Sequence, residues 1–189
     1  MNSTNVRNAG ILLHITSLPS AYGIGDLGTD VYAMADWLAK ANIRLWQVLP
    51  LGPTGFGNSP YAARSTFAGN ELMIDPQQLL HQGLLKACDL ENHPEFPAER
   101  VDFEAVQAWK LPLLKKAAAN FLNQGKNKHA CFETFCIQHS FWLDDYALFM
   151  ALMERYGDGR WFSHWPKQYA KREEAQLKQF VAQNEQQVM

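Results

Sequence analysis

The sequence predicts an α/β fold that begins with a parallel strand–helix–strand unit and continues into a largely helical region. Gly10–Ile15 is a short, continuous apolar run, which is typical of a strand buried on both faces of a parallel sheet. Apolar residues then recur at helical spacing between Thr29 and Ala41. Arg44–Leu51 is a second strand-like run, at the chain distance that a parallel crossover requires.

The predicted helix over 29–41 is amphipathic. Thr29 or Asp30 is placed to cap its N-terminus, and the charge of Asp30 suits the positive end of the helix dipole. The residues expected on its apolar face are Val31, Met34, Trp37, Leu38 and Ala41.

After Asp75 and Pro76 the pattern becomes helical, and no further buried strand is predicted. The expected helices are Gln77–Lys86, Phe103–Asn123, Cys131–Tyr156 and Tyr169–Gln186. Pro112 is expected to break or kink the second of these helices. Leu90–Glu99 is predicted to be an exposed linker. One face of the third helix carries an aromatic and methionine stripe that predicts core packing: Phe132, Phe135, His139, Trp142, Leu143, Tyr146, Phe149, Met150 and Met153.

Composition indicates a soluble globular protein and excludes some partners. The 189 residues are 47% hydrophobic, enough for a packed core, and the formal charge of -2 gives no electrostatic basis for binding nucleic acid or an anionic membrane. No apolar run is long enough to span a bilayer, and the N-terminus lacks an apolar signal core. Cys88, Cys131 and Cys136, an odd number, predict reduced thiols that serve packing in the cytoplasm.

The stretch Gly52–Asn70 is the strongest candidate for a functional site. Four glycines and two prolines fix its turns and allow close approach of the backbone to a ligand. It follows a predicted parallel strand, and the carboxyl ends of parallel strands are where α/β folds bind ligands. Its polar and aromatic groups come from Ser59, Tyr61, Arg64 and Asn70. The alternative is an ordered connector whose polar side chains satisfy its own backbone.

A glycine motif over Gly23–Gly28 raises the hypothesis of a dinucleotide-binding oxidoreductase. It matches G-x-G-x-x-G and lies between a predicted strand and a predicted helix. Two features oppose the hypothesis. The first glycine lies well beyond the strand tip, and the second strand ends in Val48–Leu51 without an acidic residue to hold a ribose.

Two further clusters suggest chemistry but have simpler interpretations. His129, Cys131, Cys136 and His139 have the composition of a zinc site, although their apolar surroundings favour packed thiols. Asp144 and Asp145 suggest paired catalytic carboxylates. Adjacent helical positions diverge by about 100°, so the two cannot flank one bond, and a solvated or ion-paired helix face is expected.

The ordered motifs of the chain resemble the N-terminal portion of the 4-α-glucanotransferase family, also called amylomaltases or disproportionating enzymes. The motifs that carry the resemblance are Arg7–Ser20, Tyr22–Gly28, Leu45–Gly55, Asn58–Tyr61, Phe67–Asn70, Phe141–Phe149 and Trp161–Pro166. Departures are few: Ile15 and Glu71 stand where the family usually has proline, and Ala62 where it commonly has glutamine.

The resemblance implies a fold and a reaction. The fold is the N-terminal part of a TIM (β/α)8 barrel, with residues 1–75 forming its first strand–helix–strand unit and the substrate-binding loop, and 76–189 a mostly helical inserted subdomain. The reaction transfers α-1,4-glucan segments between maltooligosaccharides by a retaining mechanism, in which two carboxylates lie about 5 Å apart. The family requires neither a metal nor an organic cofactor.

The resemblance also assigns candidate residues. Tyr61 is expected to stack on a glucose ring, with Ser59 as its hydrogen-bonding neighbour, and the partner is a maltooligosaccharide or starch-type glucan. Asn58, Arg64, Asn70 and His14 are further candidates for substrate contact, or for bracing the loop. The catalytic carboxylates of the family are expected beyond Met189, so the chain is expected to be an inactive part of such an enzyme. The alternative is a non-catalytic glucan-binding or interaction module.

Overall fold

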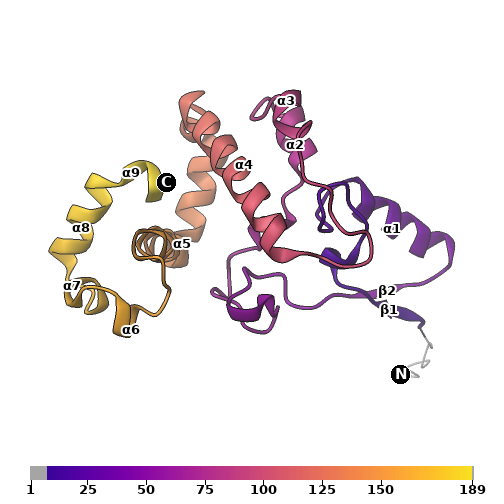
Figure 1. The fold of residues 1–189 in the computed structure, drawn as a ribbon, viewed down its shortest axis with the longest axis horizontal. Helices are drawn as coiled ribbons and strands as arrows, with labels where there is room; N and C mark the ends of the chain where they lie inside the picture. The colour runs from indigo at the N-terminus through magenta and orange to yellow at the C-terminus, as the bar shows by residue number, and fades with distance from the viewer. Residues whose placement is uncertain (1–7, 189) are drawn as a thin grey trace, which may run out of the picture. The chain divides into compact units, whose positions relative to one another are not determined.

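The computed structural model describes residues 8–188 and divides the chain into two compact units (Figure 1). The first unit extends to Gln124 and the second begins at Gly125. The first contains β1 (Gly10–Leu12), α1 (Thr29–Lys40), β2 (Leu45–Gln47), α2 (Pro76–His81), α3 (Ala87–Leu90), α4 (Phe103–Asn123) and the short 3-10 turns Ile15–Ser17, Phe56–Asn58 and Glu71–Met73. The second contains a 3-10 turn at Lys126–Lys128, α5 (Ala130–Tyr156), α6 (Trp161–His164), α7 (Lys167–Ala170), α8 (Glu174–Gln183) and α9 (Glu185–Val188).

The predicted strand–helix–strand unit is confirmed. β1 and β2 pair in parallel, with Gly10 opposite Leu45, and α1 connects them. Each strand is only three residues long, and the chain turns into a 3-10 helix at Ile15, soon after β1 ends. The predicted burial on both faces is wrong for this chain: Leu12 is 59% and Leu45 55% exposed. Within residues 8–188 the sheet has two strands, and this leaves their side chains largely uncovered.

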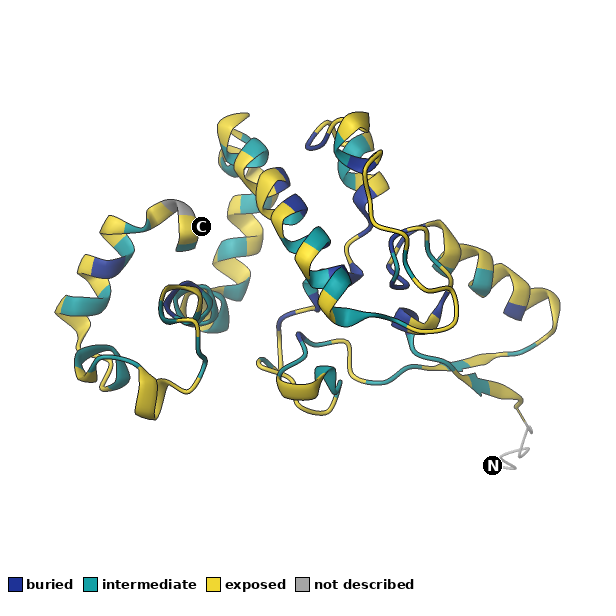
Figure 2. Ribbon diagram, in the orientation of Figure 1, coloured by how far each residue is buried: buried dark blue, intermediate teal, exposed yellow. Residues whose placement is uncertain are grey.

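α1 begins one residue after Gly28, which is its N-cap without any side-chain hydrogen bond. The expectation that Thr29 or Asp30 would cap the helix is therefore wrong, although Asp30 lies in the first turn as expected. Leu38 is buried, whereas Trp37 is 56% exposed, so the apolar face is covered only in part (Figure 2).

Two apolar clusters form the core of the first unit. One joins Tyr22 to Leu84 and Leu85, and the other joins Ile24 to Val106. α4 contributes to both clusters and runs from Phe103 to Asn123, the predicted bounds. Pro112 does not end it, because buried side chains before and after the proline hold the helix against the unit.

The division between the two units falls after Gln124 and not at residue 75. Residues 76–124 supply α2, α3 and α4, and these pack on the clusters around Tyr22 and Ile24. Between α3 and α4 the chain is mostly exposed, as predicted for the linker, although Phe96 packs against the Ile24 cluster. The proposed boundary after residue 75 concerns an insertion into a barrel and stays a prediction.

The second unit is built on α5, which agrees with the predicted Cys131–Tyr156 helix and ends at Gly157 in the left-handed region. Its core consists of Ala151, Leu152 and Phe180. Of the predicted aromatic stripe on α5, Phe149 packs against Trp165, with ring centroids 5.4 Å apart, whereas Phe135 is 44% exposed. The fully buried residues of α5 lie beside the stripe and not in it.

The single helix predicted over 169–186 is wrong, because the chain there forms α7, α8 and α9. α7 ends at Ala170, and Arg172 follows it with a φ of 56°. A residue in the left-handed region interrupts the helix, and neither glycine nor proline marks this position in the sequence.

The cysteines are free, as predicted, but Cys88 and Cys131 are exposed, so the expected packing role is wrong for these two thiols. Among residues 8–188 no helix is both long and apolar enough to cross a membrane.

Candidate functional site

The loop Gly52–Asn70 is an ordered hairpin and not a loose connector. Thr54 and Ala63 form an antiparallel bridge, and the Gly55 N–H donates to the Ala62 carbonyl at 2.8 Å. The Arg64 N–H donates to the Pro53 carbonyl at 2.9 Å on the other side of the bridge. A Cβ on Gly55 would lie 2.5 Å from the Ala62 carbonyl oxygen, so this close backbone approach requires glycine.

Asn70 fixes the base of the hairpin. Its N–H donates to the Leu51 carbonyl at 2.8 Å, and its Oδ1 accepts from the Leu72 N–H at 2.9 Å. Only 6% of Asn70 is exposed. The side chain therefore caps the 3-10 turn Glu71–Met73 and ties the loop to the first unit.

The tip of the hairpin presents aromatic rings to solvent. Tyr61 is 75% exposed and Phe56 is 99% exposed. The Ser59 Oγ accepts a hydrogen bond from the Tyr61 N–H at 3.3 Å, which fixes the backbone below the tyrosine ring. Gly57 and Asn58 both have positive φ, and this double turn shapes the tip.

Asn58 connects the hairpin tip to a helix of the same unit. Its Oδ1 accepts a hydrogen bond from Gln107 Nε2 of α4 at 3.1 Å. The tip is thus braced by a side chain from a rigid element, which helps to hold an exposed ring in a fixed position.

His14 lies two residues beyond β1, immediately before the 3-10 turn at Ile15. Its Nδ1 is buried and has no hydrogen-bond partner. Burial lowers the pKa of His14, so the neutral ring is favoured near pH 7.

The structure thus separates the sequence-predicted residues into two groups. Ser59 and Asn70 bond to the loop's own backbone, and Asn58 bonds to α4. Tyr61 and Arg64 are exposed. A role for any of them in substrate contact stays a prediction.

Sequence reasoning missed a buried polar cluster in the first unit. Lys110 is fully buried, its Nζ lies 3.5 Å from Asp26 Oδ2, and it donates to the Leu72 carbonyl at 2.7 Å. Burial raises the pKa of Asp26 and lowers that of Lys110, and the attraction between the two charges opposes both shifts. Leu72 is also bonded to Asn70 at the base of the hairpin, so this cluster helps to hold that base in place.

The glycine motif Gly23–Gly28 is the part of the sequence that could have pointed to this cluster, because Asp26 lies inside it. A Cβ on Gly28 would lie 2.6 Å from Asp75 Oδ2 and 2.8 Å from Asp26 Oδ1. Asp26 Oδ1 accepts the Gly28 N–H, and Asp75 caps α2 by accepting the Gln77 N–H. The N-terminus of α1 therefore faces two carboxyl groups, which is unfavourable for a bound pyrophosphate and disfavours the dinucleotide hypothesis.

The zinc and carboxylate-pair hypotheses gain no support from the geometry. Among the residues that the structure describes, no group of three or more His, Cys, Asp or Glu side chains is arranged to hold a metal ion. His139 Nδ1 accepts a hydrogen bond from Trp142 Nε1 at 3.2 Å. Asp145 forms an ion pair with Arg172, as expected for an ion-paired helix face, and Asp144 is exposed.

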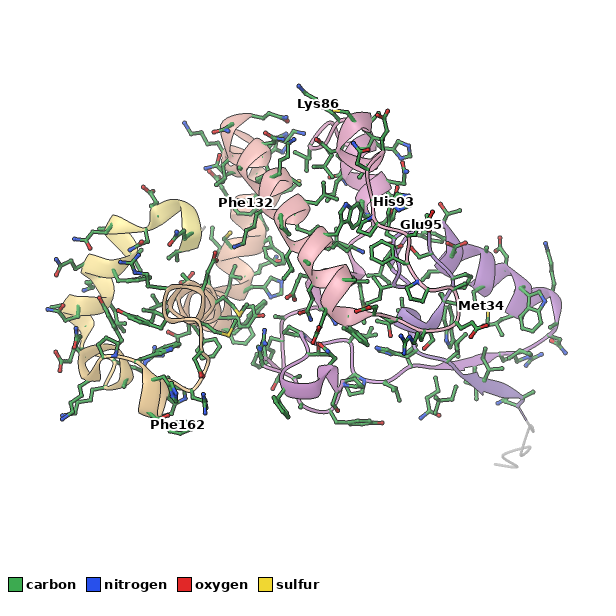
Figure 3. All side chains as sticks on the ribbon, viewed as in Figure 1. Met34, Lys86, His93, Glu95, Phe132 and Phe162 are labelled. Atoms are coloured by element: carbon green, nitrogen blue, oxygen red, sulfur yellow. The ribbon has the colours of Figure 1, made fainter. Side chains whose placement is uncertain are left out.

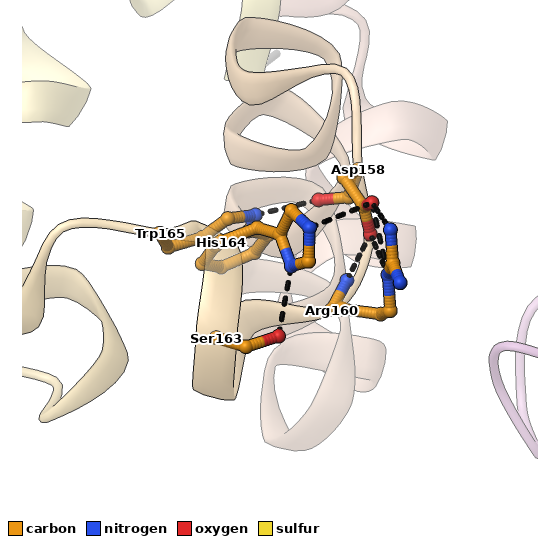
Figure 4. A network of polar contacts seen from close by, with 5 residues as sticks. All are labelled: Asp158, Arg160, Ser163, His164 and Trp165. Carbon is orange, nitrogen blue, oxygen red and sulfur yellow. Dashed lines mark hydrogen bonds and ion pairs between the residues drawn. The ribbon is translucent and has the colours of Figure 1, made fainter.

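A polar network around α6 has the composition of a catalytic triad but not its geometry (Figure 4). Ser163 Oγ lies 2.8 Å from His164 Nδ1, whereas His164 Nε2 is 3.8 Å from Asp158 Oδ2, too far for a hydrogen bond. Arg160 contacts both carboxylate oxygens of Asp158 and holds its pKa well below the usual range. The network therefore fastens the turn between α5 and α6, and the Asp158 carbonyl also accepts a hydrogen bond from Trp165 Nε1.

The fold and the hairpin together define an α/β protein whose candidate site lies on the loop that follows a parallel strand. A family model described as 4-alpha-glucanotransferase matches residues 13–189. The chain belongs to the 4-α-glucanotransferase family. The resemblance seen in the sequence motifs is thereby confirmed.

Relatives and a solved structure agree with this assignment. The chain is 46% identical to a 4-alpha-glucanotransferase from Aquifex aeolicus and 44% identical to one from Thermus thermophilus, over 93% and 92% of its length. A solved amylomaltase from Streptococcus agalactiae, in complex with acarbose, matches 97% of the chain with a TM-score of 0.86 and 34% identity. The chain spans only 35%, 34% and 37% of these three proteins, respectively.

Proposed function

We propose that this chain is the N-terminal part of a 4-α-glucanotransferase that transfers α-1,4-glucan segments between maltooligosaccharides, and that it supplies glucan contacts. Family membership supports the reaction class. The similar amylomaltase from Streptococcus agalactiae was solved with acarbose, which supports a sugar-like ligand.

Tyr61 is the residue that we propose contacts the glucan. Its ring is 75% exposed on a hairpin that is closed by the Gly55–Ala62 backbone bond and braced through Asn58. An exposed ring held by a rigid loop is the platform that the apolar face of a glucose unit packs against. Ser59, Asn58 and Asn70 then act mainly by holding this ring in place, and His14 offers a neutral imidazole at the end of β1.

The remaining parts of the proposal concern the whole enzyme. We place residues 1–75 in the first strand–helix–strand unit of a (β/α)8 barrel and 76–189 in a helical insertion. Catalysis is by retaining double displacement, with both catalytic carboxylates outside these 189 residues. Consistent with this, Asp145 and Asp158 are each paired with an arginine. The free thiols fit a reducing cytoplasm.

Titration with maltotriose, followed by calorimetry, tests the contact role of Tyr61. We expect Tyr61→Ala to weaken binding about tenfold, because it removes one aromatic platform. Tyr32→Ala is the matched control, since Tyr32 is also an exposed tyrosine, 67% accessible, but lies on α1. Equal affinities of Tyr61→Ala and Tyr32→Ala would refute the role of Tyr61.

A second measurement tests the location of the catalytic carboxylates. Incubation of the chain with maltotriose, followed by chromatography of the products, is expected to yield neither glucose nor longer maltooligosaccharides. Disproportionation by this chain at the rate of a complete relative would place the catalytic residues within it and contradict that part of the proposal.

A further inference from the structure

The second unit contains a pocket of about 260 Å³ whose walls are aromatic and aliphatic apart from one ion pair. Its lining includes Phe149, Trp161, Trp165 and Tyr169, together with the ion-paired side chains of Asp145 and Arg172. All of these residues follow Gly125, so the pocket shares none of them with the Gly52–Asn70 hairpin.

We propose that this pocket, which we call the α5–α7 pocket, binds a glucose unit of an α-1,4-glucan as a second sugar site. The proposal deepens the glucan-related function above and rests on it. It assigns the pocket to neutral carbohydrate.

The aromatic walls offer ring faces in fixed positions. Phe149 and Trp165 have centroids 5.4 Å apart and planes inclined by 42°, so the two rings are not stacked flat on each other. Trp165 is fastened by its Nε1, which donates to the Asp158 carbonyl at 2.6 Å. Preorganised ring faces suit the C–H face of a pyranose, which gains contact without ordering new side chains.

The ion pair supplies hydrogen-bonding groups next to the rings. Asp145 and Arg172 come from α5 and from the turn after α7, and their side chains are 65% and 62% exposed. A guanidinium has five N–H donors and a carboxylate about four acceptor positions, so the pair retains capacity for adjacent hydroxyl groups. Arg172 has a φ of 56°, and this unusual turn places its guanidinium against Asp145.

The balance of charge selects among ligand classes. Because Asp145 and Arg172 neutralise each other, the lining favours neither an anion nor a cation. A purely apolar ligand would cover the ion pair without replacing its water, which is costly. A neutral ligand with one apolar face and several hydroxyls satisfies both parts of the lining, and a glucose unit has this chemistry.

NMR titration of the chain with maltotriose tests the proposal separately from the Tyr61 site. The methyl groups of Leu177, which lines the α5–α7 pocket, report on this site, and the amide of Ala63 reports on the hairpin. We expect saturable shifts at Leu177 in both the unmodified chain and Tyr61→Ala. Shifts at Ala63 alone would overturn the second site and leave the hairpin site intact, and shifts at Leu177 alone would do the reverse.

Substitutions within the pocket provide the second arm. Trp161→Ala removes a wall residue that is 48% exposed, and we expect it to weaken the Leu177 response about tenfold. Phe162→Ala is the matched control, since Phe162 is the neighbouring aromatic residue of α6 (Figure 3). Phe162 is 70% exposed and is not among the residues that line the pocket. Equal responses in the two variants would overturn the proposal.

The ion pair has its own matched pair of variants. Asp145→Asn is expected to weaken the response several-fold, because it removes the charge that orients Arg172. Asp144→Asn removes the adjacent exposed carboxylate, which does not line the pocket, and is expected to leave the response unchanged. If maltotriose and a small apolar alcohol shift Leu177 equally, the pocket is a general apolar cavity and the assignment to carbohydrate is wrong.

Discussion

The two units of the chain use polar groups in opposite ways. In the first, Lys110 and Asp26 are buried together beneath the base of the hairpin. In the second, ion pairs such as Asp145–Arg172 lie at the surface, and the interior consists of aliphatic and aromatic side chains around Leu152. Buried polar groups hold irregular backbone in place, whereas packed helices need mainly apolar contact.

This difference matches what each unit has to hold. The first unit contains the long loop Gly52–Asn70, and loop backbone needs hydrogen-bond partners that helices supply to themselves. Lys110 meets one such need by donating to the Leu72 carbonyl. We therefore expect the first unit to be sensitive to loss of a charge and the second to be sensitive to loss of apolar volume.

The largest expected effect is that of Lys110→Met. The substitution leaves Asp26 buried without its partner and the Leu72 carbonyl without its donor, so we expect the free energy of unfolding to fall by about 3–5 kcal/mol. Urea denaturation measures the loss, and hydrogen exchange shows whether it is confined to the peptides around residues 70–75 and 103–115.

Two further variants test whether the buried charge is the cause. Lys116→Met removes a lysine of the same helix that is 53% exposed and pairs with Asp89, and it should change stability far less. The double variant Asp26→Asn/Lys110→Met should recover part of the loss, because it removes both charges together. A double variant less stable than Lys110→Met would contradict this account.

The long helices and the strand–helix–strand unit were predictable because their signals are local. α1, α4 and α5 follow apolar periodicity over three or more turns, and their bounds agree with the prediction within a residue or so. The predicted strands were longer than the observed ones, since an apolar run does not show where strand pairing stops. The break at Arg172 was missed because no glycine or proline marks that turn.

The candidate site was predictable in outline only. Glycine and proline content identified the hairpin, and its aromatic residues proved to be exposed at the tip. The loop-bracing role of Asn70 was one of two roles that the sequence left open. The pairing of Asp26 with Lys110 was missed, because it joins residues that are far apart in the sequence. The α5–α7 pocket was missed for the same reason: its walls come from α5, α6, α7, α8 and the turn after α7.

In the second unit, Leu152→Ala should lower the free energy of unfolding more than Ile137→Ala does. Leu152 is 2% exposed and packs with Ala151 and Phe180, so the cavity left by the substitution should cost about 3 kcal/mol. Ile137→Ala is the control on the same helix, since Ile137 is 74% exposed, and it should cost less than about 0.5 kcal/mol. Similar losses in the two variants, measured by urea denaturation, would show that apolar burial does not dominate this unit.

The smallest expected effects are on the pH dependence of stability, and they have opposite signs in the two units. Burial raises the pKa of Asp26 above 3.8, so the folded state holds this proton more tightly. The stability that Asp26 contributes is therefore fully present below pH 3.8 and is lost as the pH rises through its folded pKa. Arg160 lowers the pKa of Asp158, so its contribution is present above pH 3.8 and is lost as the pH falls.

Asp26→Asn and Asp158→Asn measure these two contributions directly. As the pH rises from about 3 to 6, the stability of the unmodified chain relative to Asp26→Asn should fall, and its stability relative to Asp158→Asn should rise. Lys110 opposes the effect of burial on Asp26, which keeps the first slope shallow. Two slopes of the same sign would mean that Lys110 outweighs the burial of Asp26, and the contrast between the units would then lie in the depth of their charges and not in the sign of their response to pH.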